Sequence, residues 1–332
     1  MVNGEKSGVL EAIRRSGLQK LLALGALLIM CTFFSIFGQN FFSHSAFMNI
    51  LDASYYIGFM AIGQTFVIIT GGIDLSVGTV MMSGALIGGV AYNVWHWPIA
   101  FCLVVIVIVA TIFGLINGLL IAKLHLPPFI VTLGTQFISL GFGSIVAEVQ
   151  TQQYPTVNQA DGWFKTAFYR TQGGFPMGAV FLLLFFIAAY ILLTRTKLGR
   201  YTYAIGSNEE AARISGINID KWKVIVYVLS GFSAGLAGIL YAATYTTIVP
   251  QTGNGLELYA IAAVVIGGTS LAGGVGSLVG SLIGVFIMTV LKDGLMSMNM
   301  QSQWQIFFTG VVVILAVLLD IYRSKKAAQV KN

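Results

Sequence analysis

The stretch IAFCLVVIVIVATIFGLINGLLIA, residues 99–122, contains no charged side chain. As a helix, a run of this length can cross the hydrocarbon core of a bilayer, which takes about 20 apolar residues. A chain inside lipid must satisfy its own backbone hydrogen-bonding groups, and a helix does so within one segment. The stretch therefore predicts a transmembrane helix. The runs at 21–38, 177–194 and 307–321 are similarly apolar and predict further spans.

The composition of the whole chain agrees with this prediction. Of the 332 residues, 57% are hydrophobic and 9% are charged, whereas a soluble domain carries about 25% charged residues. Cys31 and Cys102 both fall in apolar runs, which favours small core residues over a disulfide or metal ligands. We therefore predict an all-α, polytopic transmembrane helical bundle without a metal site.

The pattern of apolar runs and loops predicts about ten spans. They lie at 21–38, 48–70, 77–94, 99–122, 127–147, 177–194, 223–245, 257–271, 275–291 and 304–322. If the N-terminus is cytoplasmic, only Lys165, Arg170 and Lys292 of the 18 Lys and Arg residues fall outside. The positive-inside rule requires such a bias, so both termini are predicted to be cytoplasmic. The same bias accounts for the net charge of +6 without a nucleic-acid partner.

We predict one transmembrane domain, residues 21–322. A cytoplasmic, amphipathic N-terminal segment (1–20), which we expect to be retained, precedes it, and a basic cytoplasmic tail (323–332) follows it. The main external loop is 148–176 and the main cytoplasmic segment is 195–223.

Two glycine-containing stretches resemble each other at a constant spacing, IITGGIDLSVGTVMMSGALIG (68–88) and VVIGGTSLAGGVGSLVGSLIG (264–284). Paired glycine-interrupted segments in the two halves of a transporter indicate its moving region. The alternative is that two tight turns have converged on Gly-Gly. The candidate conformational turns comprise Gly71, Gly72, Asp74, Ser76, Gly78, Gly267, Gly268, Gly273 and Gly274.

Asp74 is a carboxylate at such a turn, and carboxylates in or beside a membrane usually have a role. It can cap the helix that begins at Val77, with Ser76 sharing this role, or pair with a basic residue of a cytoplasmic partner. A proton relay would need companion acids inside the bundle. Asp52 and Glu257, predicted at the outer ends of spans, come nearest, which weakens the case for a proton-coupled carrier.

The segment RTKLGRYTYAIGSNEEAARISGINIDKWK (195–223) is charged and amphipathic, unlike the rest of the chain. Within it, 207–216 predicts a short helix, with Ser207 or Asn208 as N-cap, acidic residues in the first turn and Gly216 as the stop. A helix of this kind suits the docking of a soluble partner. The alternative is a simple surface linker.

Glu210-Ala211-Ala212-x-x-x-Gly216 resembles the EAA-x-x-x-G loop of permeases of ATP-binding-cassette importers, a coupling helix that sits in a groove of the ATPase. The motif lacks the downstream Leu-Pro of its fullest form, as in the sugar branch of the family. TGGIDLSVG (70–78), LGRYTYAIGSNEEAARISGI (198–217) and IAAVVIGGTSLAGGVGS (261–277) resemble the ribose-type branch of inner-membrane permeases. The resemblance runs from about residue 40 to residue 320.

This resemblance implies a permease subunit, not an enzyme, that carries a monosaccharide (a ribose-like pentose first) across the bacterial cytoplasmic membrane. The chain lacks G-x-x-x-x-G-K-[ST], so no cofactor is expected on it, and ATP and Mg would bind a separate ATPase with two fused nucleotide-binding domains. A sugar-binding protein outside and a second permease copy or paralogue are the other implied partners. The alternative is a secondary carrier or channel for a small polar solute. The coupling candidates are Ser207, Asn208, Glu209, Glu210, Ala211, Ala212, Arg213 and Gly216.

Two further sets of candidates follow. The three external cations Lys165, Arg170 and Lys292 are candidates for docking acidic groups of the binding protein. Polar residues inside the predicted spans are candidates for lining the pathway, and each is equally explained as a hydrogen bond between helices. They are Gln64, Thr65, Asn117, Thr132, Thr135 and Gln136.

Overall fold

The computed structural model describes residues 2–329, and most of them are helical. Met1 and residues 330–332, the extreme ends of the predicted N-terminal segment and tail, lie outside the described residues. The longer helices are α1 (Val2–Phe37), α2 (His44–Ile69), α3 (Val77–Asn93), α4 (Ile99–Lys123), α5 (Pro128–Val146), α7 (Met177–Arg195), α10 (Ile219–Tyr245), α11 (Leu256–Ile266), α12 (Leu278–Ser297) and α13 (Ser302–Gln329). The short elements are α6 (Trp163–Phe168), α8 (Lys197–Ser207) and α9 (Glu209–Ile214), with β1 (Gln152–Gln153) paired antiparallel to β2 (Thr247–Ile248).

Among the described residues, seven helices are long and apolar enough to cross a membrane: α1 from Lys20, α4, α5, α7, α10, α12 and α13. The prediction of an all-α, polytopic chain is therefore confirmed. The predicted span at 257–271 is wrong at its C-terminal end, because α11 stops at Ile266. Gly268 ends it with a φ of +94°, a conformation that glycine adopts at low cost. With 11 residues, α11 is about 16 Å long, roughly half the hydrocarbon thickness.

Helix α5 carries polar side chains on its buried face and apolar side chains on its exposed face. On α5, Thr135, Gln136 and Ser139 are buried, while Phe137 and Ile138 are more than half exposed. A water-soluble helix would have the opposite arrangement. Lipid around the bundle makes the exposed apolar face favourable, since polar groups in a membrane turn toward protein partners.

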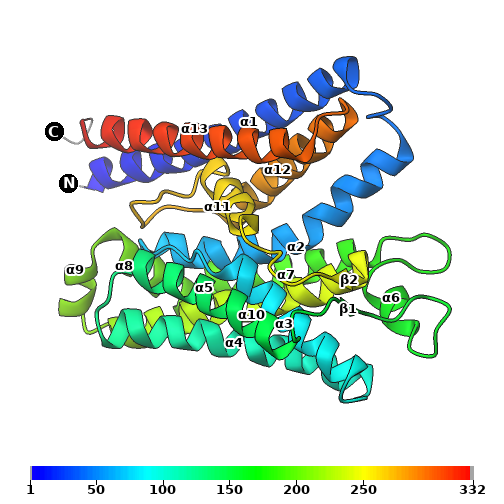
Figure 1. The fold of residues 1–332 in the computed structure, drawn as a ribbon. Helices are drawn as coiled ribbons and strands as arrows, with labels where there is room; N and C mark the ends of the chain where they lie inside the picture. Colours follow the sequence, from blue (N-terminus) through cyan, green and yellow to red (C-terminus); the bar gives the residue numbers. More distant parts are fainter. Residues whose placement is uncertain (1, 330–332) are drawn as a thin grey trace.

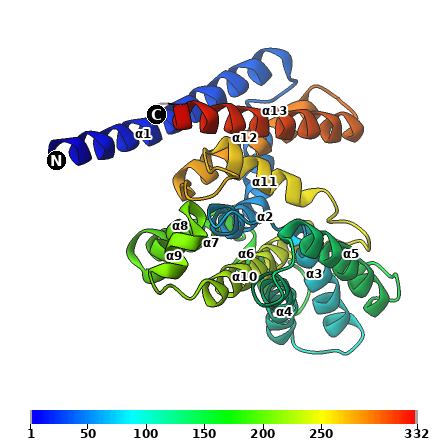
Figure 2. The ribbon, with the colours of Figure 1, turned by 90° about the vertical axis from the view of Figure 1, so that its left-hand side faces the viewer.

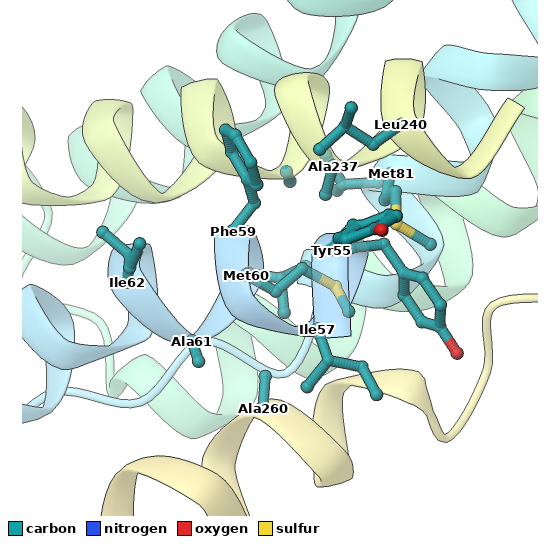
Figure 3. Close-up of a cluster of buried hydrophobic side chains, with 14 of the residues drawn as sticks. Tyr55, Ile57, Phe59, Met60, Ala61, Ile62, Met81, Ala237, Leu240 and Ala260 are labelled. Atoms are coloured by element: carbon teal, nitrogen blue, oxygen red, sulfur yellow. The ribbon is translucent and has the colours of Figure 1, made fainter. Parts of the chain in front are cut away.

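Helix α2 is the centre of the bundle. Figure 2 shows it nearly end-on in the middle of the molecule, with α11 and α12 above it and α10 below it. Its residues 52–69 are all buried. In Figure 3, Phe59 points toward Ala237 and Leu240 of α10, and Ile57 points toward α11. Elements from both halves of the sequence therefore pack on this one helix.

Small residues allow α4 and α10 to pack closely. An ideal Cβ on Gly231 would lie 2.9 Å from the Cα of Gly114, closer than real Cβ contacts allow. In lipid, glycine pairs of this kind let backbones approach and gain dispersion contacts. The patterns Gly114-x-x-x-Gly118 and Gly231-x-x-x-Gly235 thus face each other.

The short elements separate to the two ends of the molecule. In Figure 1, α8 and α9 lie at the left with both chain termini, while β1, β2 and α6 lie at the right. At the right-hand end, the buried Tyr154 follows β1, and its hydroxyl donates to the carbonyl of Ala85 at 2.6 Å. The segment 195–223 and the loop 148–176 therefore occupy opposite ends of the helices.

Candidate functional site

The two glycine turns end their helices in the same way. At the end of α2, the N–H of Gly71 (φ +77°) donates to Ile68 O and that of Gly72 donates to Val67 O. At the end of α11, the N–H of Gly268 donates to Val265 O and that of Thr269 donates to Val264 O. A left-handed glycine with these bonds is a common helix C-cap. Gly71 therefore corresponds in space to Gly268, one residue away from the register of the sequence match, which pairs it with Gly267.

The two turns contact each other and the end of α8. The N–H of Gly274 donates to Ile69 O at 2.8 Å, and the Tyr203 hydroxyl of α8 donates to Gly276 O at 2.9 Å. Gly206 packs so closely on Ile69 O and on the N–H of Gly274 that no Cβ fits there. The helix directly before α9 is thus in contact with both turns.

Asp74 is buried, with 1% of its surface exposed. Its Oδ1 accepts from the backbone N–H (3.0 Å) and the hydroxyl (2.6 Å) of Ser76, and its Oδ2 accepts from the Ser230 hydroxyl (2.8 Å). The Gln64 amide donates to the backbone carbonyl of Asp74. Burial rules out contact with a soluble partner in this conformation, so of the two predicted roles the carboxylate has the local one. It fixes the turn at Ser76, directly before α3. The predicted cap of α3 is not formed as expected, because the Ser76 side chain makes no cap bond and Asp74 accepts from Ser76 and Ser230 rather than from an N–H of α3.

The contacts of Asp74 continue into a buried polar network. The Asn117 amide donates to Ser76 Oγ at 3.0 Å, and the Thr135 hydroxyl donates to Asn117 Oδ1 at 2.6 Å. The neighbouring Gln136 donates to Glu257 Oε1 at 3.0 Å. These bonds join the turn before α3 to residues of α2, α4, α5 and α10, and they join α5 to α11.

Glu257 was predicted at the outer end of a span, and it lies in the first turn of α11. It is 4% exposed and faces the first turn of α3, where Gly78 leaves room for it. The reason is the short length of α11, which begins inside the protein. Asp74 therefore has a companion acid within the bundle, and one argument against a proton-coupled carrier is lost.

The six predicted pathway residues are all buried. Gln64, Asn117, Thr135 and Gln136 belong to the network around Asp74. Thr65 donates to Ser281 of α12 at 2.8 Å, and Thr132 donates only within its own helix. In this conformation they act as hydrogen bonds between or within helices, and their role in a pathway stays a prediction.

The predicted cytoplasmic helix is present as α9. The Asn208 side chain accepts from Ala211 N–H at 2.9 Å as its N-cap, and Gly216 follows the helix with φ +82°. Glu209 holds the helix in place by ion pairs to Arg213 (3.3 Å) and to Lys223 of α10 (2.7 Å). The other N-cap candidate, Ser207, is the last residue of α8.

The side chains of the α9 motif divide into a buried and an exposed set. Ala212 is buried between Ile205 of α8 and Ile219 of α10. The exposed set is Glu210, Ala211, Arg213 and Ile214. Ile214 is 83% exposed, a large apolar side chain at the polar end of the molecule. Sequence analysis missed it, although its spacing of four from Glu210 places both on one helix face.

The three predicted docking cations have partners inside the chain in this conformation, and their role in docking stays a prediction. Arg170 pairs with Asp52 at 2.6 Å, Lys165 donates to Thr246, and Lys292 donates to the Tyr56 hydroxyl at 3.0 Å. These contacts join segments far apart in sequence. No local pattern shows these contacts.

At Arg170, a neutral hydroxyl group adds to the ion pair with Asp52. Tyr169 also donates to Asp52, at 3.0 Å. Burial, then the charge of Asp52, raise the pKa of Tyr169 to about 12, so this hydroxyl stays a donor at neutral pH. Burial lowers the pKa of Lys165, and the charge of Asp52 opposes that shift.

Among the described residues, no group of three or more His, Cys, Asp or Glu side chains is placed to hold a metal ion. The fold and the site thus define a helical, multi-pass membrane protein with paired glycine turns, a buried polar network beside them and a capped helix exposed at one end.

Comparison with known proteins identifies the family. Residues 46–317 match the family described as the branched-chain amino acid transport system permease component. The chain is 39% identical to the ribose import permease protein of Escherichia coli K12 over 310 residues, covering 92% of this chain and 95% of that protein. It is 38% identical to the ribose import permease protein of Bacillus subtilis 168, covering 92% and 94%, and 35% identical to the fructose import permease protein of Rhizobium meliloti, covering 91% and 84%. The chain therefore belongs to this permease family, as its motifs predicted.

Proposed function

We propose that the chain is the membrane-spanning permease subunit of an ATP-binding-cassette importer for a monosaccharide, with a ribose-like pentose as the first candidate. The match to ribose import permeases over nine-tenths of both chains carries this proposal. A xylose transport permease of Escherichia coli K12, 31% identical, and the fructose permease extend the class of solutes to other monosaccharides.

The proposed topology has ten crossings in a bacterial cytoplasmic membrane. It counts α2, α3 and the half-length α11 with its following segment 267–277 in addition to the seven long apolar helices. Both termini and α9 would face the cytoplasm, and β1, β2 and α6 the outside. The bias of Lys and Arg toward one side supports this orientation.

In this proposal the exposed face of α9 docks on a separate ATPase, which binds ATP and Mg and has two fused nucleotide-binding domains. The face carries one acid, one base and the apolar Ile214. Its charged side chains are well solvated before docking, and Ile214 can be buried in a groove of the ATPase. A binding protein delivers the sugar at the opposite end. A second copy of the chain, or a paralogue, completes the pore.

The contacts of α8 give this arrangement a mechanism. A displacement of α9 would also move α8, which directly precedes it. Through Gly206, α8 contacts both the turn after α2 and the segment after α11, so both would be displaced. The turn after α2 in turn carries Asp74 and its network. Closure of the ATPase would then shift α2 and α11 against their neighbours, as in other two-state switches.

Gentle detergent purification of the tagged chain from its own membranes tests the proposal. The expected result is stoichiometric recovery of a P-loop protein, reduced by Glu210→Lys. Glu148→Lys, an exposed acid at the opposite end, is the control and should retain the partner. Recovery of the chain alone as a stable oligomer would contradict the proposal.

The buried pair of Asp74 and Glu257 gives one specific reason to keep a second candidate, a secondary carrier or channel for a small polar solute. This candidate predicts uptake into vesicles without ATP.

A further inference from the structure

A polar cavity of about 200 Å³ lies between α2, α10 and α12. It is at the end that carries α6 and the sheet, because Asp52 in its wall pairs with Arg170, which follows α6. The cavity is small beside drug-sized sites of about 300–1,000 Å³, so it suits one small ring. Its polar lining is Asn49, Asp52, Tyr245, Thr289, Lys292 and Asp293.

A second cavity, of about 160 Å³, continues this one toward the surface. The two share Asn49, Asp293 and Met296, and the second is also lined by Gln39 and Asn40 of the α1–α2 connection. Amide and hydroxyl groups therefore lead from the surface to Asp293, in a chain whose helices are otherwise mostly apolar.

The charged groups around the cavity can form further hydrogen bonds to a ligand. Asp52 and Asp293 are each 7% exposed, and carboxylates in a membrane protein usually face a cavity and have a function. Asp52 Oδ1 has no hydrogen-bond partner among the described residues. Lys292 donates to the neutral hydroxyl of Tyr56 at 3.0 Å, and Asp293 follows it on α12.

This mixture of groups selects the chemistry of the ligand. Both signs of charge line one small cavity, so an anion or a cation meets repulsion from part of the wall. A neutral ring with several hydroxyls can donate to Asp293 and accept from Lys292 at once. The half-exposed ring of Tyr245, packed against Tyr241 and Tyr56, offers an apolar face to the C–H side of such a ring.

We propose that this cavity is a receiving site in the permease for a neutral monosaccharide at the outer end of the helices. The proposal rests on the proposed function and adds to it a site on this chain, separate from the binding protein. The sugar enters past Asn49 and Met296, and binds between Thr289, Lys292 and Asp293.

Site-directed labelling tests the site without transport. In a Cys31→Ser/Cys102→Ser background, Met296→Cys should react with a membrane-impermeant thiol reagent added from the outside. D-ribose, D-xylose or D-fructose at high concentration should slow the reaction severalfold, and glycerol at equal concentration should not. Ser302→Cys, exposed at the start of α13, is the control and should react at one rate with or without sugar. Labelling of Met296→Cys that no sugar slows would overturn the site.

A second test of the site measures sugar uptake by proteoliposomes that contain the chain, its ATPase and its binding protein. Asp293→Asn should lower uptake at limiting sugar about tenfold or more, the loss expected for a hydrogen bond to a charged group, and the isosteric Thr289→Val should lower it by roughly threefold to tenfold, the loss expected for a neutral one. ATP hydrolysis without sugar should stay at the wild-type rate, which also reports folding and assembly. If wild-type import is robust and both variants equal it, the site is wrong and the importer stands. If the wild type imports none of the three sugars with ATP, both proposals fall.

Discussion

At the scale of the residue, Asp74 shows how a carboxylate is accommodated in an apolar protein. Its three hydrogen bonds come from Ser76 and Ser230, so removing it leaves buried donors without a partner. We expect Asp74→Ala to lower the free energy of unfolding by about 1–3 kcal/mol, measured as a lower thermal midpoint in detergent. Asp220→Ala is the control, because Asp220 is partly exposed in a 3.7 Å ion pair, and should change stability by less than about 1 kcal/mol. Equal effects would contradict the role given to Asp74.

Ile214 is a large apolar side chain exposed on α9, and burying it against a partner would be favourable. Ile214→Ala should leave the stability of the isolated chain unchanged, because the side chain makes few contacts, and should weaken capture of the ATPase about tenfold, as for a buried apolar side chain at an interface. The measurement is the amount of ATPase bound in a titration with the purified chain. Leu124→Ala, 62% exposed in the α4–α5 connection, is the matched control. If the two variants capture the ATPase equally, α9 is not the docking element.

At the scale of the element, the approach of α4 and α10 depends on two facing glycines. Gly231→Leu should lower stability by about 1–3 kcal/mol, the usual cost of overpacking, seen as a lower thermal midpoint. Gly141→Leu is the control, since Gly141 of α5 has no neighbour within 4 Å. A variant at Gly231 as stable as the one at Gly141 would show that the two backbones separate at no cost.

Helix α8 is the proposed link between α9 and the glycine turns. Gly206→Ala forces α8 away from Ile69 and Gly274, so we expect retained ATPase binding with sugar uptake reduced at least about tenfold, which corresponds to 1.4 kcal/mol of coupling. Gly310→Ala, with open space around it, should import as the wild type does. Normal uptake by Gly206→Ala would mean that the contacts of Gly206 do not couple α9 to the glycine turns.

The same elements show which features a sequence reveals. The caps of α9 at Asn208 and Gly216 were predictable because capping depends on a few consecutive residues. The end of α11 at Ile266 was not predicted, because the span was extended through Gly-Gly-Thr-Ser to Leu271 to approach the length of a crossing. The partners of Asp52 and Lys292 lie more than a hundred residues away, and a local pattern carries no information on such pairs. The buried position of Glu257 follows from the length of α11 and was missed with it.

At the scale of the whole molecule, the central claim is that this chain imports a monosaccharide at the expense of ATP hydrolysed by another protein. α9 lies at one end of the bundle and α6 with the sheet at the other (Figure 1), and the polar cavity is at the end that carries α6, where Asp52 in its wall pairs with Arg170. In the proposed function, a single molecule presents a surface for the ATPase at one end and a site for the sugar at the other.

The most direct test is uptake of labelled ribose by proteoliposomes that hold the chain with its ATPase and binding protein, with ATP and Mg sealed inside. The account predicts accumulation against the gradient, abolished when ATP is replaced by ADP and when the binding protein is left out. Accumulation that continues without ATP would contradict it and favour the secondary carrier.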